Sequence, residues 1–217
     1  PDDIHCIHVM QTLYRMTNNY LGLCELLLVE KDMSISPIER CNLLIYIAEV
    51  CVKHLNKKQF AINILQQARE ENPQNANIYR LLCSILAEEK RWLEYVNVLN
   101  DVIRYLPSPN DKIATLSRIG LVYELQLCDE TSAISSYERI LKLDPTNMYA
   151  IKKLEFIYKK TRNISAYYDL TLRTNPFIAS PLKRARRLYL VALKFVTIQG
   201  DYNQAIEVLE KAMEITN

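Results

Sequence analysis

Glycine is scarce in this chain of 217 residues, which has only Gly22, Gly120 and Gly200. A fold rich in sheets and tight turns needs more glycine, and we find no convincing run of alternating strand residues. Three glycines so far apart cannot form a phosphate-binding loop. No apolar stretch approaches the roughly 18 residues that a membrane-spanning helix needs. These absences leave an all-α fold as the economical prediction.

Histidine is equally scarce, with His5, His8 and His54 as its three copies. So few histidines leave little material for a catalytic triad or a general acid-base pair, and we predict neither enzymatic activity nor a cofactor. His5 and His8 lie about one turn apart on an expected first helix, a spacing that could hold a metal ion. No second pair of ligands follows, so the prediction is that no metal is bound.

The cysteines give an expectation about the compartment. All six are scattered, and no pair has the C-x-x-C spacing (Cys6, Cys24, Cys41, Cys51, Cys83 and Cys128). We interpret them as reduced core residues, which predicts a cytoplasmic protein. The Asn163-Ile164-Ser165 glycosylation pattern is then accidental. Because the chain begins at Pro1 without an initiator methionine, we expect it to be a piece of a longer protein.

The sequence repeats itself at a shift of about 72 residues, which we call the repeat period. Ala61, Ala133 and Ala205 coincide at this shift, as do Met10, Leu82 and Leu154. The turn Asn72-Pro73-Gln74-Asn75 recurs as Asp144-Pro145-Thr146-Asn147, in which the proline ends one helix and the polar residues cap the next. Gly200 and Asp201 are predicted to form such a corner too, with a left-handed glycine followed by a capping aspartate and Gln204 completing a capping box.

Each period divides into two helical hairpins, and one hairpin in each period carries a recognisable signature. Leu116-x2-Ile119-Gly120-x2-Tyr123, followed by Ala133-x3-Tyr137 and Pro145, resembles the tetratricopeptide repeat family. The resemblance implies an α-solenoid, a right-handed superhelix of helix-turn-helix repeats that forms a single array over residues 1–217. We expect hairpins at about 4–36, 41–75, 76–109, 113–147, 148–181 and 185–217. In the alternate hairpins, Gln11, Cys83 and Glu155 replace the small residue where the helices meet.

A basic stretch gives the strongest hint of a binding surface. Between Thr146 and Phe195 there are eleven basic residues and two acidic ones, a net charge of +9, which leaves −7 for the rest of a chain whose net charge is +2. The resemblance implies that the first helix of each hairpin lines a concave groove that binds a peptide. The groove residues expected from it are Tyr149, Lys152, Phe156, Lys159, Arg118 and Arg186. Cations among aromatic rings suit an acidic peptide or a free carboxylate, although the stretch can equally be a solvated surface.

These observations predict a non-catalytic scaffold that binds a protein partner. Two alternatives stay open: a helical-repeat module that binds nucleic acid, and a regulatory or oligomerising arm of an enzyme whose catalytic domain lies outside this segment. Trp92 is predicted to pack at the start of a second helix, because Tyr20 and Ile164 replace it one period away. Ile206 and Met213 are expected to stay uncovered at the end of the last helix. Either further repeats then continue the array in the full protein, or this end associates with another molecule, self-association included.

Overall fold

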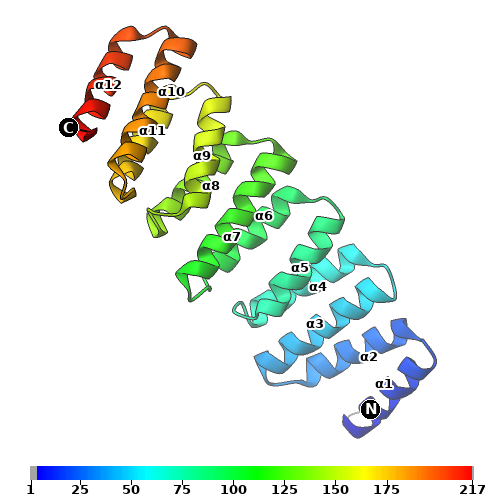
Figure 1. Ribbon diagram of the computed structural model, residues 1–217. Helices are drawn as coiled ribbons and strands as arrows, with labels where there is room; N and C mark the ends of the chain where they lie inside the picture. The colour runs from blue at the N-terminus through cyan, green and yellow to red at the C-terminus, as the bar shows by residue number, and fades with distance from the viewer. Residues whose placement is uncertain (1–3, 217) are drawn as a thin grey trace. The chain divides into compact units, whose positions relative to one another are not determined.

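The computed structural model describes residues 4–216 and divides the chain into two compact units, Pro1–Leu106 and Pro107–Asn217. Within residues 4–216 there are twelve α-helices and no strand, so the all-α prediction is confirmed. In each unit, successive helices run in alternating directions and pack as neighbours (Figure 1). Both units are therefore built from helical hairpins, and each is described separately.

The first unit contains six helices. Their bounds are α1 (Ile4–Met16), α2 (Tyr20–Met33), α3 (Pro37–Lys53), α4 (Lys58–Glu71), α5 (Ala76–Glu88) and α6 (Trp92–Ile103). Ser36 caps α3 by accepting the backbone N–H of Glu39, and Asn75 caps α5 by accepting that of Asn77. Trp92 is the first residue of α6 and packs edge-on against Tyr95, so its predicted structural role is confirmed.

The second unit contains the other six helices and three short helical segments. Their bounds are α7 (Pro109–Val122), η1 (Tyr123–Leu127), α8 (Glu130–Leu143), α9 (Met148–Lys160), α10 (Ile164–Thr174), η2 (Asn175–Phe177), α11 (Pro181–Lys194), η3 (Phe195–Gln199) and α12 (Tyr202–Thr216). The segments η1 and η3 are π-helical turns that extend α7 and α11, and they lie one repeat period apart. The sequence analysis did not anticipate these turns, each of which precedes a hairpin loop.

The hairpin loops share one backbone feature that recurs with the repeat period. Each loop contains a residue in the left-handed conformation: Asn18, Lys90 and Arg162 form one series, and Asn56, Cys128 and Gly200 form the other. In the second series the loop is closed by a backbone hydrogen bond that joins the same two positions each time, from Lys57 to Cys51, from Asp129 to Tyr123 and from Asp201 to Phe195. The backbone geometry of the loops therefore repeats with the same period as the sequence.

The corner at Gly200 agrees with the prediction except in one detail. Gly200 has a φ of 68°, and the Asp201 carboxylate accepts the backbone N–H of Gln204 at 3.0 Å. The N–H of Asp201 donates to the Phe195 carbonyl, which leaves no place for Gln204 as the reciprocal arm of a capping box. The expected box is therefore only half formed, because the bond that closes the loop already uses that donor.

Small residues let the helices of the signature hairpins approach closely. Ala61, Ala133 and Ala205 are all buried. At Gly120 an added Cβ would lie 2.6 Å from the ring of Tyr137, closer than two carbon atoms can pack. Gly120 is therefore required by the close approach of α7 and α8.

The cysteine prediction needs one correction. Cys24, Cys41, Cys51 and Cys83 are buried as expected, whereas Cys6 and Cys128 are exposed. Cys128 lies in the loop after η1, where the chain reverses direction and no core is available to cover it. The sulfurs of Cys24 and Cys51 lie 3.8 Å apart in the core of the first unit.

Ion pairs link consecutive hairpins with opposite polarity in the two units. In the first unit, Lys58 at the start of α4 lies 3.2 Å from Glu88 at the end of α5. In the second unit, the equivalent residues one period on are Glu130 and Lys160, which lie 2.6 Å apart. The second helix of one hairpin thus contacts the first helix of the next hairpin in the same way in both units, with the positive and negative residues exchanged.

Candidate functional site

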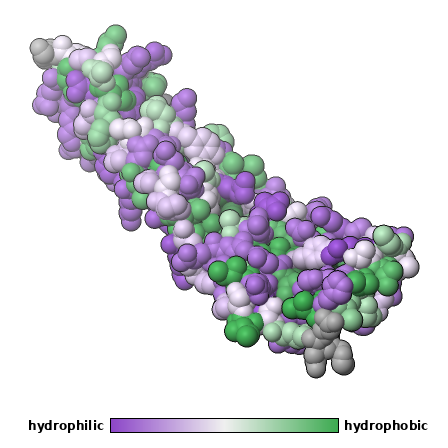
Figure 2. Space-filling model, turned by 90° about the horizontal axis from the view of Figure 1, so that it is seen from below, coloured by the Kyte–Doolittle hydropathy of each residue, from purple (hydrophilic) through white to green (hydrophobic). Residues whose placement is uncertain are grey.

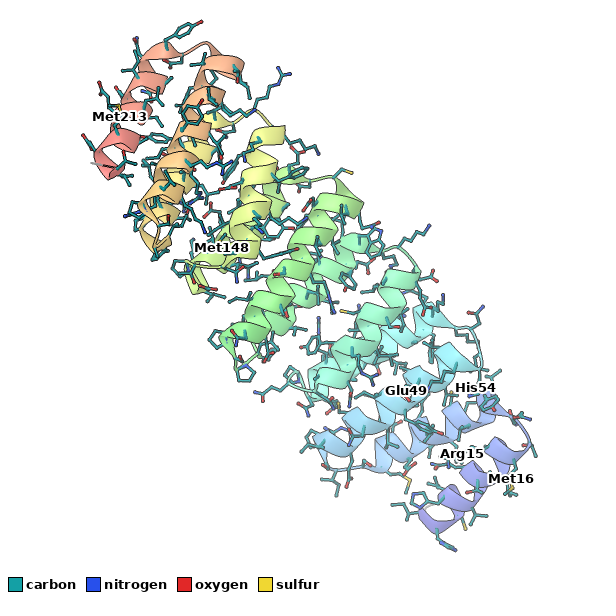
Figure 3. The ribbon with its side chains drawn as sticks, in the orientation of Figure 1. Arg15, Met16, Glu49, His54, Met148 and Met213 are labelled. Atoms are coloured by element: carbon teal, nitrogen blue, oxygen red, sulfur yellow. The ribbon has the colours of Figure 1, made fainter. Side chains whose placement is uncertain are left out.

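The second unit contains a cavity of about 390 Å³ beside the first turns of α9. Its apolar lining comes from Met148 and Ile151 on α9 and from Phe177 and Ile178 in the connection between α10 and α11. Lys152 on α9 also lines it. Figure 3 labels Met148 at the start of α9. The cavity therefore combines an apolar lining with an exposed ammonium group, a combination typical of a site that binds a side chain of mixed character.

Helix caps fix the walls of this cavity. Asn147 accepts the backbone N–H of Ala150 at 3.1 Å, which sets where α9 begins. The Asp144 carboxylate in turn accepts bonds from the hydroxyl of Thr146 and the side-chain amide of Asn147. These bonds hold the pKa of Asp144 below its usual range, with the Thr146 hydroxyl as the largest cause. The predicted capping role of the Asp144 to Asn147 turn is confirmed.

An arginine network closes the inner side of the cavity. Arg187 on α11 donates to Glu155 at 2.7 Å, to the Thr174 hydroxyl at 3.0 Å and to the Asn175 side-chain oxygen at 3.0 Å. Asn175 is buried and also donates to the carbonyl of Arg184. Because its guanidinium donates to all three acceptors, Arg187 links α9 and the end of α10 to α11.

Lys152 differs from Arg187 in this respect. Its side chain is exposed, and within residues 4–216 it makes no ion pair. Its neighbour Lys153 is engaged instead, with both oxygens of Glu124 within 3.0 Å. Lys152 is thus a cation at the cavity that an incoming carboxylate could reach without breaking an existing ion pair.

The other residues predicted on α9 lie along the same helix. Tyr149 is partly exposed and packs edge-on against Tyr137, with ring centroids 6.1 Å apart. Phe156 is exposed. The ammonium of Lys159 lies 4.5 Å from the centroid of the Tyr167 ring and 3.9 Å from Glu155, so it already has a cation–π partner and an acidic neighbour.

The two arginines predicted from neighbouring hairpins do not join Lys152 at the cavity. Arg118 is exposed on α7. Arg186 is exposed on α11, where it lines a different hollow together with residues of α12. Arg187, which the sequence analysis did not single out for binding, is the arginine that reaches the cavity beside Lys152. The two arginines are consecutive residues on one helix, so their side chains point in directions about 100° apart. The sequence pattern alone did not show which of the two faces the cavity.

Three of the eleven cations in the basic stretch pair with glutamates of the preceding hairpin. Lys153 pairs with Glu124, Lys160 with Glu130, and Arg173 with Glu138 at 2.7 Å. All three glutamates lie before Thr146 in the sequence, outside the window that gave +9. The charge asymmetry along the chain is therefore partly cancelled in space.

Buried tyrosines accompany these ion pairs. Burial, with a further contribution from Glu155, raises the pKa of Tyr167 to about 12, against an opposing effect of Arg187. Burial and Glu138 similarly raise the pKa of Tyr158 to about 12. Both phenols therefore stay protonated at neutral pH, and they act as packing and hydrogen-bonding groups.

A second cavity lies in the first unit between α1, α2 and α3. Arg15 donates to the hydroxyl of Tyr46 at 3.1 Å, and the rings of Tyr20 and His54 stack with centroids 3.8 Å apart. Glu49 lies 3.6 Å from Lys53 (Figure 3). These polar groups satisfy one another, which makes this cavity a weaker candidate than the one beside Lys152.

The described residues show neither a metal-ligand cluster nor a membrane-spanning helix. Within residues 4–216 no three His, Cys, Asp or Glu side chains are grouped so that they could hold a metal ion, and His8 lies 3.2 Å from Glu30. No helix within these residues has the length and apolar character needed to cross a bilayer.

Comparison with known proteins finds a family match in two segments of the second unit. Residues 113–147 and 197–217 match the family model of the tetratricopeptide repeat. No curated protein matches the chain. Among solved structures, a tetratricopeptide repeat protein from Parabacteroides merdae is 16% identical with a TM-score of 0.47, and the match covers 97% of this chain and 78% of that one. A structure of MamA is 14% identical with a TM-score of 0.42, covering 100% and 96%.

A third similar structure is YrrB, described as a tetratricopeptide protein with an unusual peptide-binding site. It is 16% identical with a TM-score of 0.38, and the match covers 80% of this chain and 84% of that one. The family match at α7 to α8 and at α12 agrees with the signature found in the sequence, and the helices alternate as that signature predicts. Residues 4–216 thus form helical hairpins, and within them two segments are similar to the tetratricopeptide repeat.

Proposed function

We propose that this chain is a non-catalytic scaffold that binds a segment of a protein partner at the cavity beside Lys152. The observation that carries the proposal is the combination of an apolar cavity with a cation that makes no ion pair among residues 4–216. A bound segment would place a hydrophobic side chain against Met148 and Ile151, and an aspartate, a glutamate or a terminal carboxylate beside Lys152. The apolar contact supplies buried area, while the charge attracts and orients the segment.

The exposed rings on α9 extend this surface. Tyr149 and Phe156 are exposed three residues before and four residues after Lys152 on this helix, and rigid aromatic side chains lose little entropy when they are covered. Lys159 contributes less than the sequence suggested, because it is already held by Tyr167 and Glu155. The acidic character of the partner therefore rests chiefly on Lys152.

The pairing of the basic stretch argues against a nucleic-acid track. A phosphate backbone is bound by several cations that give up water and counterions. Here Lys153, Lys160 and Arg173 would each have to leave a glutamate first. Binding a short acidic segment needs no such exchange.

Peptide selection tests the proposal directly. A random-peptide display library would be selected on the chain, and the recovered peptides measured by fluorescence anisotropy. We expect peptides that combine an acidic residue with a large apolar one. Lys152→Glu should weaken them by about tenfold or more, since it replaces an attraction with a repulsion.

The matched control is Lys183→Glu. Lys183 is exposed on α11 outside the cavity lining, and its reversal changes the net charge of the chain equally. If both variants bind the peptides alike, or if Lys152→Glu binds as well as the unmodified chain, this site is wrong. A labelled single-stranded RNA that binds the chain and loses affinity in Lys152→Glu would instead favour the nucleic-acid alternative.

A further inference from the structure

The first unit holds an aromatic ring in the place that corresponds to the cavity beside Lys152. Ile151 lines the cavity, and its equivalent one repeat period earlier is Tyr79 on α5. Phe177 lines the cavity too, and its equivalent is Tyr105. Tyr79 is 5% exposed, and the centroid of its ring lies 6.4 Å from that of Tyr105, within the range at which aromatic rings attract one another. The repeat therefore shows what fills this position when the chain itself supplies the side chain.

The Tyr79 hydroxyl shows which polar group lies within reach of such a ring. It donates to the carbonyl of Pro73 at 2.7 Å, in the turn that precedes α5. The equivalent turn before α9 has Pro145 at this position, and both turns separate their helices by four residues (72–75 and 144–147). An asparagine caps the following helix in each case. A ring bearing a hydroxyl in the cavity would therefore find the carbonyl of Pro145.

The change from tyrosine to isoleucine is what leaves the space open. The Ile151 side chain is much shorter than that of a tyrosine, and it forms a wall of the cavity. Phe177, on the other side, is 53% exposed. Because protein interiors are close-packed, a cavity of about 390 Å³ between these two side chains has room for the ring that one unit contains and the other lacks.

The lining of the cavity also suits an aromatic side chain. Phe177 offers the ring contact that Tyr105 makes in the first unit, and the thioether of Met148 can lie against a ring edge, which is a favourable contact. Exposed apolar surface alone would not identify the occupant, since Figure 2 shows hydrophobic side chains scattered among hydrophilic ones over both units. The equivalent ring in the first unit is what makes the assignment specific.

The position of Lys152 limits the sequence of the segment that carries the ring. Lys152 follows Ile151 directly on α9, and both line the cavity. A carboxylate that reaches Lys152 while a ring lies beside Ile151 must therefore come from a residue close to that ring. In an extended segment this means a separation of at most about two residues.

We propose that the residue bound in the cavity is a tyrosine of the partner segment, packed against Phe177 as Tyr79 packs against Tyr105, with an acidic residue close to it in the segment. Its hydroxyl donates to the carbonyl of Pro145, and the acidic residue pairs with Lys152. This inference rests on the proposed function, because it names the side chain that the cavity receives. The partner is thus an acidic segment that contains tyrosine.

Substituted peptides test the identity of the bound side chain. We expect the display selection to return peptides in which a tyrosine lies beside an acidic residue. Replacing this tyrosine by phenylalanine should weaken binding by about threefold to tenfold in fluorescence anisotropy, because the hydrogen bond to Pro145 is lost. Leucine should weaken it further, because the ring contact is lost as well.

Variants of the chain test the same site from the other side. Ile151→Tyr places a ring of the chain itself in the cavity, so it should abolish peptide binding without lowering the urea midpoint of unfolding. Phe177→Ala should weaken binding by about tenfold. Tyr189→Ala is the matched control, since Tyr189 is 49% exposed on α11 and lies outside the cavity lining. It should bind the peptides like the unmodified chain, and circular dichroism should show that all three variants stay folded.

The compound p-cresol, which is the tyrosine side chain as a free molecule, tests the ring site without a peptide. In a chain with isotope-labelled isoleucine methyl groups, millimolar p-cresol should shift the NMR signals of Ile151 and Ile178, which both line the cavity. Methylcyclohexanol has a hydroxyl but no aromatic ring and should shift them less. In Ile151→Tyr the signal of Ile178 should no longer respond.

Two results would overturn this inference and leave the proposed function intact. One is a set of peptides that depend on Lys152 but bind equally well with leucine in place of tyrosine. The other is undiminished binding of such peptides to Ile151→Tyr. Failure of the proposed function looks different, because then Lys152→Glu weakens no recovered peptide. If p-cresol leaves the signals of Ile151 and Ile178 unchanged, the tyrosine site is wrong in either case.

Discussion

Cys128 and Gly200 occupy the same loop position in successive repeat periods, and exchanging their residue types tests the role of the left-handed backbone. Cys128 has a φ of 52° and Gly200 a φ of 68°. Cys128→Gly removes the side chain that is strained at this position, while Gly200→Ala introduces one. No heavy atom lies within 4 Å of a Cβ added at Gly200, so the second change is purely conformational.

The two effects should be similar in size and opposite in sign. A residue with a Cβ loses about 1–2 kcal/mol in the left-handed region. Glycine avoids this loss but makes the unfolded chain more flexible, which costs about 0.4–1 kcal/mol. Cys128→Gly should therefore raise the free energy of unfolding by about 0.5–1 kcal/mol, and Gly200→Ala should lower it by a similar amount.

Urea unfolding followed by circular dichroism measures both changes. The denaturant midpoint should rise for Cys128→Gly, fall for Gly200→Ala and stay nearly constant for the control Cys128→Ala, which keeps a Cβ. Lys90→Gly provides an independent case in the first unit, where Trp92 fluorescence can follow unfolding. A Cys128→Gly variant that unfolds more easily than Cys128→Ala would refute the reasoning.

Three further outcomes follow from packing, pH and charge. Gly120→Ala should lower the free energy of unfolding by about 1–3 kcal/mol, measured in urea, because its Cβ would overlap the ring of Tyr137. Hydrogen bonds to the Ser132 and Thr131 groups hold the pKa of Asp129 below its usual range, so its stabilisation is present above about pH 4 and is lost as the pH falls through the lowered value. Asp129→Asn keeps the cap without titrating, so thermal melts between pH 5 and 2 should decline less steeply. Glu130→Lys and Lys160→Glu should each lower the urea midpoint slightly, because each sets two like charges side by side, and the double variant should recover most of that loss.

The repeat period was enough to predict most of the fold. Comparing the chain with itself at that shift placed the helical hairpins and marked Gly200 as a left-handed corner. The same corner at Cys128, Lys90 and Arg162 was not predicted, because these residue types do not signal a positive φ. The register of the repeat was itself the signal that could have transferred the conformation from Gly200 to Cys128.

The candidate site was less accessible to sequence reasoning. Lys152 and its neighbours on α9 were predicted together because they share a helix. Of the predicted residues Lys152 lines the cavity, whereas Arg186 lines a different hollow and Arg187 reaches the cavity. The basic stretch was counted along the chain, whereas its ion pairs join residues about one hairpin apart, such as Lys153 and Glu124. Such pairs depend on the register between helices, which composition does not contain.

The exchanged polarity of the two inter-hairpin ion pairs bears on how the chain avoids misassembly while it folds. Helices α5 and α9 have similar apolar stripes, so either could initially collapse onto α4 or α8. Wrong pairing would set Lys58 against Lys160, or Glu130 against Glu88. Each correct pair adds little to stability, yet each incorrect pair is repulsive, so the difference favours the native order of the hairpins. A repetitive sequence can in this way keep nearly identical hydrophobic surfaces and still encode which neighbour belongs to which.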